Sequence, residues 1–312
     1  MKFYSNQVCC GSYACLNAIQ DSTIDLSLFE ISTGVPFGIR HYEDKNFDRL
    51  LTTFCDPNQG LDDALDLWGY DVTTISVSSC QESLDALRSH GPGPAVLGPV
   101  NMGGLGYYPN AAMFNRMDHY IVLDYHSDRE IDCIDSEGLF GLRVTREHLE
   151  KWINIDGIPE ARQRFTLRWI CDQRAWNIAD VLVSSLRKAA CHLRQAEECG
   201  QGAEAVRSCC RYLAQNSSFQ WRLPFLYDLE YLYQRKCLFQ IFLTELQSET
   251  LLASKRIDQL RQTVQEQQSL LNTGYRELRW GAGFNEIYLL RFAELEQKLT
   301  TYVAQCAEFI SG

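Results

Sequence analysis

The pattern of hydrophobic and polar positions changes character near residue 160. Before that point the apolar runs are short and are separated by glycine and proline, which is typical of strands, short helices and turns. After it, long stretches carry apolar residues at helical spacing with few helix-breaking residues. The chain therefore predicts two domains, residues 1–160 with mixed helices and strands and residues 161–312 composed of helices.

Short helices and strands alternate in the first region. Gly69 follows the third expected helix and should end it as a C-cap. A long loop from Pro99 to Asp118 carries Tyr107 and Tyr108, which either cap a pocket or pack within the loop. The expected helices cover residues 11–20, 25–30, 61–68 and 81–89, and the first two expected strands cover residues 72–77 and 95–98.

Three strand patterns follow this loop, at residues 119–125, 130–135 and 141–144. Only short turns separate them, and this spacing is typical of an antiparallel meander. Thr145 follows the third strand and is expected to cap a short helix. The first region therefore predicts an α+β domain with an antiparallel sheet.

The second region has the pattern of a helical domain. The apolar positions Ile257, Leu260, Val264 and Leu271 are nearly heptad-spaced, but Gln267 interrupts them, which favours a bundle helix over a long coiled coil. The expected helices cover residues 174–198, 203–215, 224–247, 250–272 and 284–309.

The charge of the chain narrows the range of partners. The formal net charge is −11 and no run of Lys and Arg stands out, so we expect no nucleic-acid partner. An acidic surface also argues against docking on anionic membranes. No apolar stretch reaches the length of a signal peptide, or the roughly 18 residues of a membrane span. We therefore expect a soluble protein that stays in the cytoplasm.

The cysteines of the chain favour isolated thiols over a metal site or a disulfide scaffold. There are 13 of them, an odd number in a long chain. Structural zinc needs clustered ligands, usually with a Cys-x-x-Cys spacing. The closest pairs here are the adjacent cysteines Cys9–Cys10 and Cys209–Cys210, which cannot easily point at one metal ion. We therefore expect no metal and no cofactor.

Cys10 is followed by Gly11 and then by the first expected helix. A thiol at a helix N-terminus lies at the positive end of the helix dipole, and the backbone N–H groups there stabilise its thiolate. The glycine would let the backbone approach an acyl oxygen closely. The alternative is a buried structural cysteine at the start of a core helix, and Cys10 considered alone favours that alternative.

His119 and Asp135 lie on neighbouring strands of the expected meander. His119 opens an otherwise apolar strand, and Asp135 ends the next one. A histidine at a strand edge is more often structural than catalytic, but adjacent antiparallel strands can bring these two side chains together. An acid that accepts from the imidazole N–H fixes its tautomer and supports it as a base.

The three residues occur in the order cysteine, histidine and acid. The cysteine belongs to an N-terminal helix and the other two to a later meander, which fits the papain-like topology. We therefore predict that Cys10, His119 and Asp135 are the catalytic groups of a papain-like cysteine-enzyme domain.

These residues also carry a resemblance to known enzymes. The segments CGSYACLN (residues 10–17), HYIVLDY (119–125) and IDCID (131–135) resemble the cysteine, histidine and aspartate segments of papain-like bacteriocin-leader peptidases. The chain is more similar to the butirosin biosynthesis protein H family. That family also has a glycine-rich loop, here GVPFG (34–38), and a tyrosine-rich loop before the histidine.

The resemblance extends into the second region. FLYDLEYLY (225–233) and FQIFLTEL (239–246) resemble the helical domain that often follows in the butirosin biosynthesis protein H family. The resemblance implies acyl transfer in antibiotic and other secondary-metabolite biosynthesis. The cysteine would take an acyl group from an acyl carrier protein thioester and pass it to a small-molecule amine.

The chain departs from the leader peptidases at the oxyanion position. Those enzymes have a glutamine several residues before the cysteine, whereas the nearest candidates here are Gln7 and Asn6. The backbone N–H of Cys10 could supply half of the oxyanion hole. Cys9, next to Cys10, is a second candidate nucleophile, and the glycine that follows favours Cys10.

Three functions remain open at this point. The first is a cysteine-dependent acyltransferase, or a related amide- or ring-forming enzyme; the second is a cysteine peptidase or amide hydrolase; and the third is a non-catalytic scaffold. Acyl carrier proteins are typically acidic, as this chain is, so docking would need a local basic face. The candidates for such a face are Arg235, Lys236, Lys255, Arg256 and Arg261.

Overall fold

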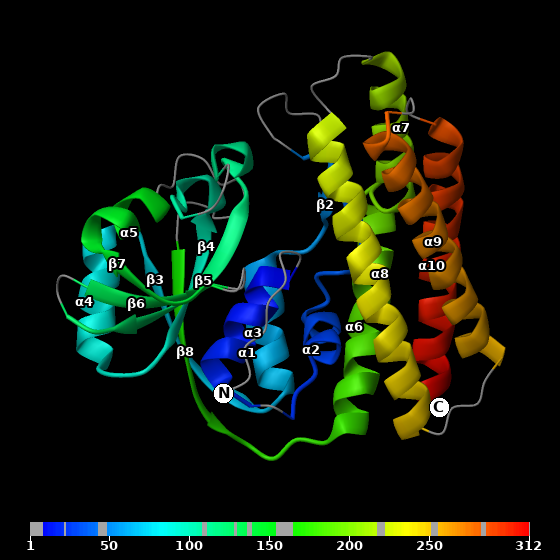
Figure 1. The fold of residues 1–312 in the computed structure, drawn as a ribbon. Coiled ribbons are helices and arrows are strands. Elements are labelled where there is room, and N and C mark those ends of the chain that lie inside the picture. The colour runs from blue at the N-terminus through cyan, green and yellow to red at the C-terminus, as the bar shows by residue number, and fades with distance from the viewer. Residues whose placement is uncertain are drawn as a thin grey trace. The chain divides into compact units, whose positions relative to one another are not determined.

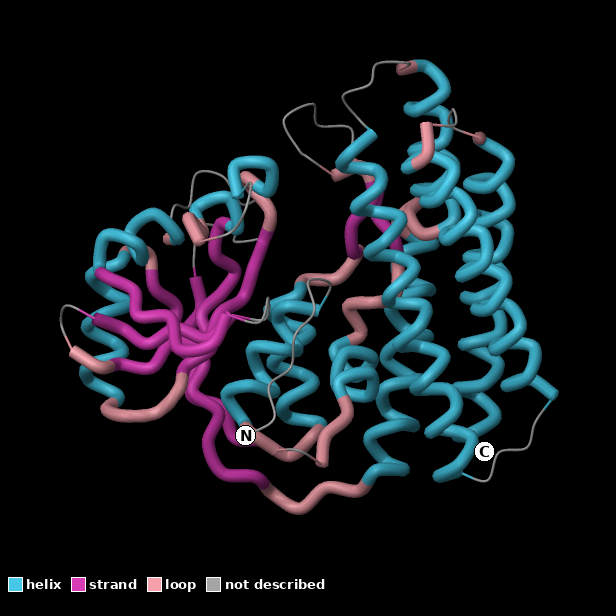
Figure 2. Tube along the Cα trace, viewed as in Figure 1, coloured by secondary structure: helices cyan, strands magenta, loops and turns pink. Residues whose placement is uncertain are grey.

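The protein is mixed α/β, with antiparallel sheets and a helical C-terminal region (Figures 1 and 2). The computed structural model describes residues 9–21, 23–42, 49–107, 111–127, 130–135, 139–153, 165–216, 222–250, 255–281 and 285–311. The chain forms two compact units. One comprises Met1–Leu26 and Pro57–Ala175, and the other comprises Ser27–Asp56 and Trp176–Gly312.

The first unit is built on an antiparallel sheet. In the part of the chain that the structure describes, this sheet has six strands in the order β3-β8-β4-β5-β6-β7. They are β3 (Tyr70–Val77), β4 (Ala95–Asn101), β5 (Asp118–Tyr125), β6 (Glu130–Asp135), β7 (Leu139–Thr145) and β8 (Phe165–Gln173). The consecutive neighbours β5, β6 and β7 confirm the predicted meander.

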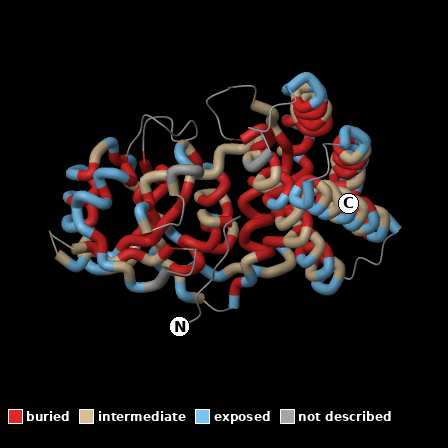
Figure 3. Tube along the Cα trace, turned by 45° about the horizontal axis from the view of Figure 1, so that its top comes forward, coloured by how far each residue is buried: buried red, intermediate tan, exposed pale blue. Residues whose placement is uncertain are grey.

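Helices cover both faces of this sheet. Helices α1 (Cys10–Ile19) and α3 (Pro57–Leu67) lie on one face, and α4 (Cys80–His90) and α5 (Arg146–Trp152) lie on the other (Figure 1). The strands and the inward sides of the helices form the buried core (Figure 3). Two short 3₁₀ turns, Met102–Gly104 and Ala111–Phe114, occupy the segment predicted as a long loop.

The predicted helices of this unit are confirmed, and their ends follow the expected signals. Gly69 adopts a positive φ of 79° directly after α3, where its N–H donates to Asp66 O at 2.9 Å. Thr145 and His148 form a capping box at the start of α5.

The prediction that the chain is helical beyond about residue 161 is wrong for β8. This strand lies between β3 and β4 and pairs with both. Its first five residues, FTLRW, are all buried. Its apolar residues alternate with Thr166 and Arg168, which is the pattern of a strand. The two polar residues are buried as well, and Arg168 pairs with Asp62 at 2.6 Å. The strand signal was therefore present in the sequence, and the predicted helical region began too early.

The second unit contains long helices and a small β-ribbon (Figure 2). The helices are α2 (Leu26–Thr33), α6 (Ile178–Glu198), α7 (Ala203–Gln215), α8 (Arg222–Thr250), α9 (Lys255–Arg279) and α10 (Glu286–Ser311). The ribbon pairs β1 (Ile39–His41) with β2 (Leu51–Thr53). Among the described residues, no helix is both long enough and apolar enough to cross a membrane.

Residues 27–56 belong to the helical unit because buried polar contacts hold them there. Asp228 of α8 is fully buried and accepts from Arg49 Nε at 2.8 Å and from the N–H groups of Leu50 and Leu51. Removing one partner of such a buried charge pair typically costs about 3–5 kcal/mol. The units therefore divide differently from the predicted domains 1–160 and 161–312.

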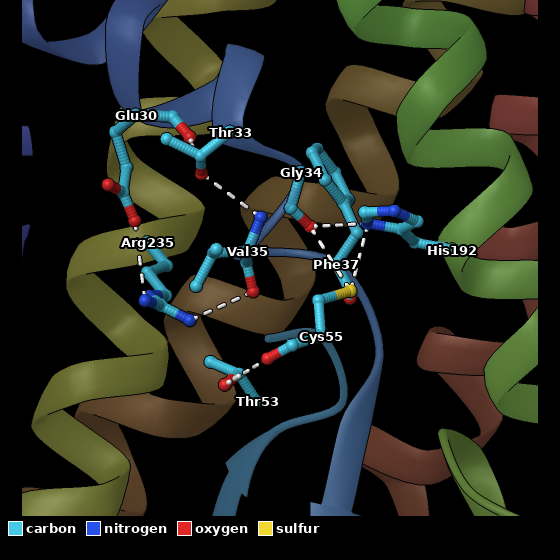
Figure 4. Close-up of polar contacts among 9 residues, drawn as sticks. All are labelled: Glu30, Thr33, Gly34, Val35, Phe37, Thr53, Cys55, His192 and Arg235. Carbon is cyan, nitrogen blue, oxygen red and sulfur yellow. Dashed lines mark hydrogen bonds and ion pairs between the residues drawn. The ribbon is translucent and has the colours of Figure 1, made fainter. Parts of the chain in front are cut away.

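Two of the basic residues expected on a docking face are buried in this unit. Arg235 pairs with Glu30 at 3.3 Å and donates to Val35 O (Figure 4), and Lys236 pairs with Glu296 at 3.0 Å. Their exposed fractions are only 6% and 4%. Their charges are neutralised inside the fold, so the expectation that they contribute to a docking face is wrong.

Candidate active site

Cys10 is the first residue of α1, at the N-terminal end of a helix that packs against β5. The first N–H groups of a helix have no partner within it, so a thiolate at this position is electrostatically favoured. Cys10 is half-buried, whereas Cys9 is only 3% exposed. A Cβ on Gly11 would lie 2.9 Å from Leu61 Cδ1, so the glycine also lets α1 approach α3 closely.

The strand register places His119 and Asp135 next to each other. Asp135 pairs with Ile121, and His119 lies two residues before Ile121 on β5. Residues two apart on a strand share a face, so His119 and Asp135 are diagonal neighbours on one face of the sheet. The alternating burial of β6 puts Asp135 on the same buried face as Ile131 and Cys133. Both site residues are closed to solvent, with exposed fractions of 1% and 0%.

Hydrogen bonds join the three predicted site residues into one chain. His119 Nε2 lies 2.9 Å from Asp135 Oδ1, and His119 is also hydrogen-bonded to the Cys10 side chain. Because Asp135 engages Nε2, the imidazole nitrogen that faces the sulfur is Nδ1. The other carboxylate oxygen, Oδ2, accepts a hydrogen bond from the Tyr107 hydroxyl.

The surroundings of His119 favour its protonated form. Burial by itself lowers the pKa of His119. The charge of Asp135, together with the hydrogen bonds that His119 makes with Asp135 and Cys10, outweighs burial and raises the pKa to about 10. The site therefore favours an imidazolium beside the Cys10 side chain. This arrangement can supply a nucleophile at Cys10 and a proton at His119 Nδ1.

The raised pKa of His119 predicts a stability that falls as the pH rises. A histidine that binds its proton more tightly when folded adds stability that is fully present below pH 6.5 and is lost as the pH rises toward about 10. Asp135 is still present in Cys10→Ser, so we expect the free energy of unfolding of this variant to decrease as the pH rises above 6.5. The Cys10→Ser background keeps the ionisation of Cys10 itself out of the measurement, which is urea unfolding at a series of pH values.

The control for this prediction is the same protein with Asp135→Asn added. Without the carboxylate charge, burial dominates and the folded pKa of His119 falls below 6.5. The contribution of His119 to the stability of this variant should rise as the pH approaches about 6.5 and then stay constant. The remaining thiols are common to both proteins and affect the two curves equally, so the difference between the curves reports on His119. Parallel curves for the two proteins would contradict the assigned role of Asp135.

The two oxyanion candidates, Gln7 and Asn6, lie outside the described residues. Tyr107 is the site residue whose contact the sequence did not predict. Its position in a loop gave no periodic signal, and the tyrosine-rich composition of the loop was the only hint. Its ring also contacts Trp152, at 5.7 Å between centroids and nearly perpendicular.

A second thiol–imidazole pair lies in the helical unit. Cys55 Sγ is 2.8 Å from His192 Nδ1, which is also 3.0 Å from Gly34 O (Figure 4). Burial raises the pKa of Cys55 to about 12 despite nearby cations. In one consistent arrangement, the imidazole of His192 donates to Gly34 O and the thiol of Cys55 donates to Phe37 O at 3.5 Å. This pair has the character of a structural clamp for residues 34–37.

Comparison with known proteins leaves the family of this chain open. No protein-family model matches the chain. The chain is similar to the "Uncharacterized protein YobF" of Bacillus subtilis (strain 168), with 35% identity over 105 residues. The match covers 33% of this chain and 33% of that protein, so the chain matches about a third of the length of its curated relative.

Proposed function

We propose that this chain is a cysteine-nucleophile acyltransferase with a papain-like catalytic unit, similar to the butirosin biosynthesis protein H family. The observation that carries the proposal is the hydrogen-bonded chain Cys10–His119–Asp135. Its supporting geometry is the nucleophile at a helix N-terminus, packed against the strands that carry the base and the acid. This is the arrangement that thiol–thioester exchange needs.

The proposed reaction has two balanced steps. In the first, the Cys10 thiolate attacks the thioester carbonyl of an acyl carrier protein, and the carbonyl–sulfur bond to the carrier breaks. The imidazolium of His119 gives its proton to the departing carrier thiol. In the second, an amine attacks the acyl-cysteine, His119 accepts the amine proton, and the Cys10 thiolate departs. The imidazolium–thiolate pair is regenerated.

Burial of the site argues against a purely structural scaffold. Enclosing a carboxylate and an imidazole costs free energy that apolar side chains of similar volume would not cost. Cys10 is the member of the three that is not fully buried, so a donor would meet the sulfur first. A scaffold would gain nothing from this order of exposure, whereas an acyl acceptor requires it.

Partner and location belong to the same proposal. Three candidates remain for contact with an acidic carrier protein: Lys255 and Arg256, which are exposed at the start of α9, and Arg261, which is half-buried. The 13 cysteines all fall in described segments and stand as free thiols. We propose the cytoplasm as the location, because its redox potential keeps a nucleophilic thiol reduced.

Intact-protein mass spectrometry tests the proposal. The full chain is incubated with a panel of acyl thioesters carried on acyl carrier protein, and amines are then added. A transferase should gain one acyl mass and lose it to the amine with formation of the amide. Acyl-enzyme that discharges only to water, or cleavage of peptides without any thioester, would identify a hydrolase. A chain that gains no mass and cleaves no peptide would support the scaffold.

A further inference from the structure

The carboxylate of Asp135 is held from two sides. His119 Nε2 lies 2.9 Å from one oxygen, and the Tyr107 hydroxyl donates to the other. Asp135 is fully buried, so its charge depends on these donors for the stabilisation that water would otherwise give. Each oxygen therefore has an assigned partner, and the carboxylate cannot turn without breaking a contact.

We propose that Tyr107 is a positioning residue of the active site, which fixes Asp135 as an oriented carboxylate and through it sets the imidazolium–thiolate pair of His119 and Cys10. This inference rests on the proposed function, because it gives Tyr107 a role in the same site. Tyr107 acts through Asp135, two steps away from the nucleophile.

The fold also holds the ring of Tyr107 in place. The Tyr107 ring meets the fully buried Trp152 edge to face, and Trp152 ends α5. The turn that precedes Tyr107 approaches α5 so closely that a Cβ on Gly104 would lie 2.6 Å from Lys151 O. A side chain other than hydrogen at residue 104 would push the turn and α5 apart. The hydroxyl is therefore positioned by packing against a helix rather than by the loop alone.

Cys133 is a further titratable group near Asp135. Cys133 lies two residues earlier on the same face of β6, and burial, followed by the charge of Asp135, raises its pKa well above its ordinary value. It stays a neutral thiol and leaves the carboxylate charge to His119 and Tyr107. A hydrogen bond to a charged group shifts a protonation equilibrium by about 10- to 100-fold. Losing the Tyr107 hydroxyl should thus make Asp135 take up a proton at a higher pH.

The test uses iodoacetamide, so it needs no natural substrate. The rate of Cys10 alkylation is measured from pH 4 to 10 by site-resolved mass spectrometry, with the exposed Cys171 as an internal reference. Wild-type Cys10 should stay reactive down to low pH. Its alkylation rate should fall only at the acidic end of the range, where the imidazolium–thiolate pair is lost, and we call this fall in rate the acidic limb. In Tyr107→Phe, this limb should move up by about one to two pH units.

The matched control is Tyr70→Phe. Tyr70 also donates to an aspartate, Asp21 Oδ2 at 3.3 Å, but from β3 at the far edge of the same sheet. The acidic limb of Cys10 alkylation in Tyr70→Phe should coincide with that of the wild type. If the acidic limb in Tyr107→Phe also coincides with that of the wild type, the inference is overturned. Circular dichroism checks that both variants are folded.

A second variant keeps the test decisive if Tyr107→Phe does not fold. Replacing Tyr107 by a fluorinated tyrosine preserves the ring and makes the hydroxyl a stronger donor. The acidic limb should then move to lower pH, and an unchanged limb would contradict the positioning role of Tyr107.

Failure of the proposed function and failure of the role of Tyr107 give different results. A wild-type Cys10 that reacts with the same pH dependence as Cys171 would overturn the proposed nucleophile. A normal wild type with unchanged variants would overturn only the role of Tyr107.

Discussion

Cys10→Ser is expected to remove the acyl adduct and reduce acyl transfer to the limit of detection. A serine hydroxyl next to His119 has a far higher pKa than a thiol, so almost none of it is ionised near neutral pH. The His119–Asp135 pair should survive the substitution, because its own contact at 2.9 Å does not involve the sulfur. Intact-protein mass spectrometry with carrier-bound thioesters measures the loss directly. Equal labelling of wild type and variant would rule out Cys10 as the acyl acceptor.

Two further cysteine variants identify which thiol carries the acyl group. Cys9→Ala tests the neighbouring thiol, and it should keep the label because the hydrogen bond to His119 comes from Cys10. Cys55→Ser removes the thiol of the other thiol–imidazole pair, 2.8 Å from His192. This variant should also keep the label, because burial holds the Cys55 thiol in its neutral form. If the label is lost in Cys9→Ala and retained in Cys10→Ser, the nucleophile is Cys9.

Local patterns explain why much of the first unit was predictable. Strands β5, β6 and β7 follow each other with short turns, so each pairing joins neighbours in the sequence. The alternation along β6 fixes which residues face the core, and this places Asp135 opposite Ile121 and beside His119. A one-residue slip would have turned Asp135 to the other face. The contact between the two side chains was therefore available from sequence pattern alone.

Long-range pairing explains what the sequence did not reveal. Strand β8 enters the sheet between β3 and β4, which are distant from it along the chain. Residues 27–56 join the helical unit through Asp228, whose partners Arg49, Leu50 and Leu51 lie almost 180 residues earlier. No periodicity records such a contact. Charged residues such as Arg235 read as surface positions until their buried partners are known.

The Tyr107 contact belongs to the same class of missing information. A tyrosine in an irregular loop is placed by whatever packs against the loop, and here that is Trp152 of α5, 45 residues later. The cysteine, histidine and aspartate could be proposed because their chemistry restricts their neighbours. A hydroxyl that supports the acid has no comparable sequence signal, so it required the structure.

His119→Gln is expected to slow acyl transfer by about a thousandfold or more. The imidazole gives the proton to the carrier thiol in the first step and takes the amine proton in the second, so its loss affects both. Glutamine is preferred to alanine because its amide can still donate to Asp135. An unpaired buried carboxylate would cost about 3–5 kcal/mol and could unfold the unit. The measurement is the single-turnover rate of Cys10 acylation.

The matched control for this variant is His126→Ala. His126 also faces an aspartate of β6, Asp132, at 4.0 Å, but both side chains are largely exposed. Such a surface pair contributes little to stability, so the acylation rate should stay near that of the wild type.

Iodoacetamide alkylation then separates the two tasks of His119, which are stabilisation of the thiolate and proton transfer. If its imidazolium stabilises the thiolate, Cys10 in His119→Gln should react only as the pH approaches the ordinary thiol range near 8.5. If alkylation of Cys10 keeps its wild-type pH dependence while acylation falls, His119 serves as the proton donor alone; if both keep their wild-type rates, His119 has no part in the reaction.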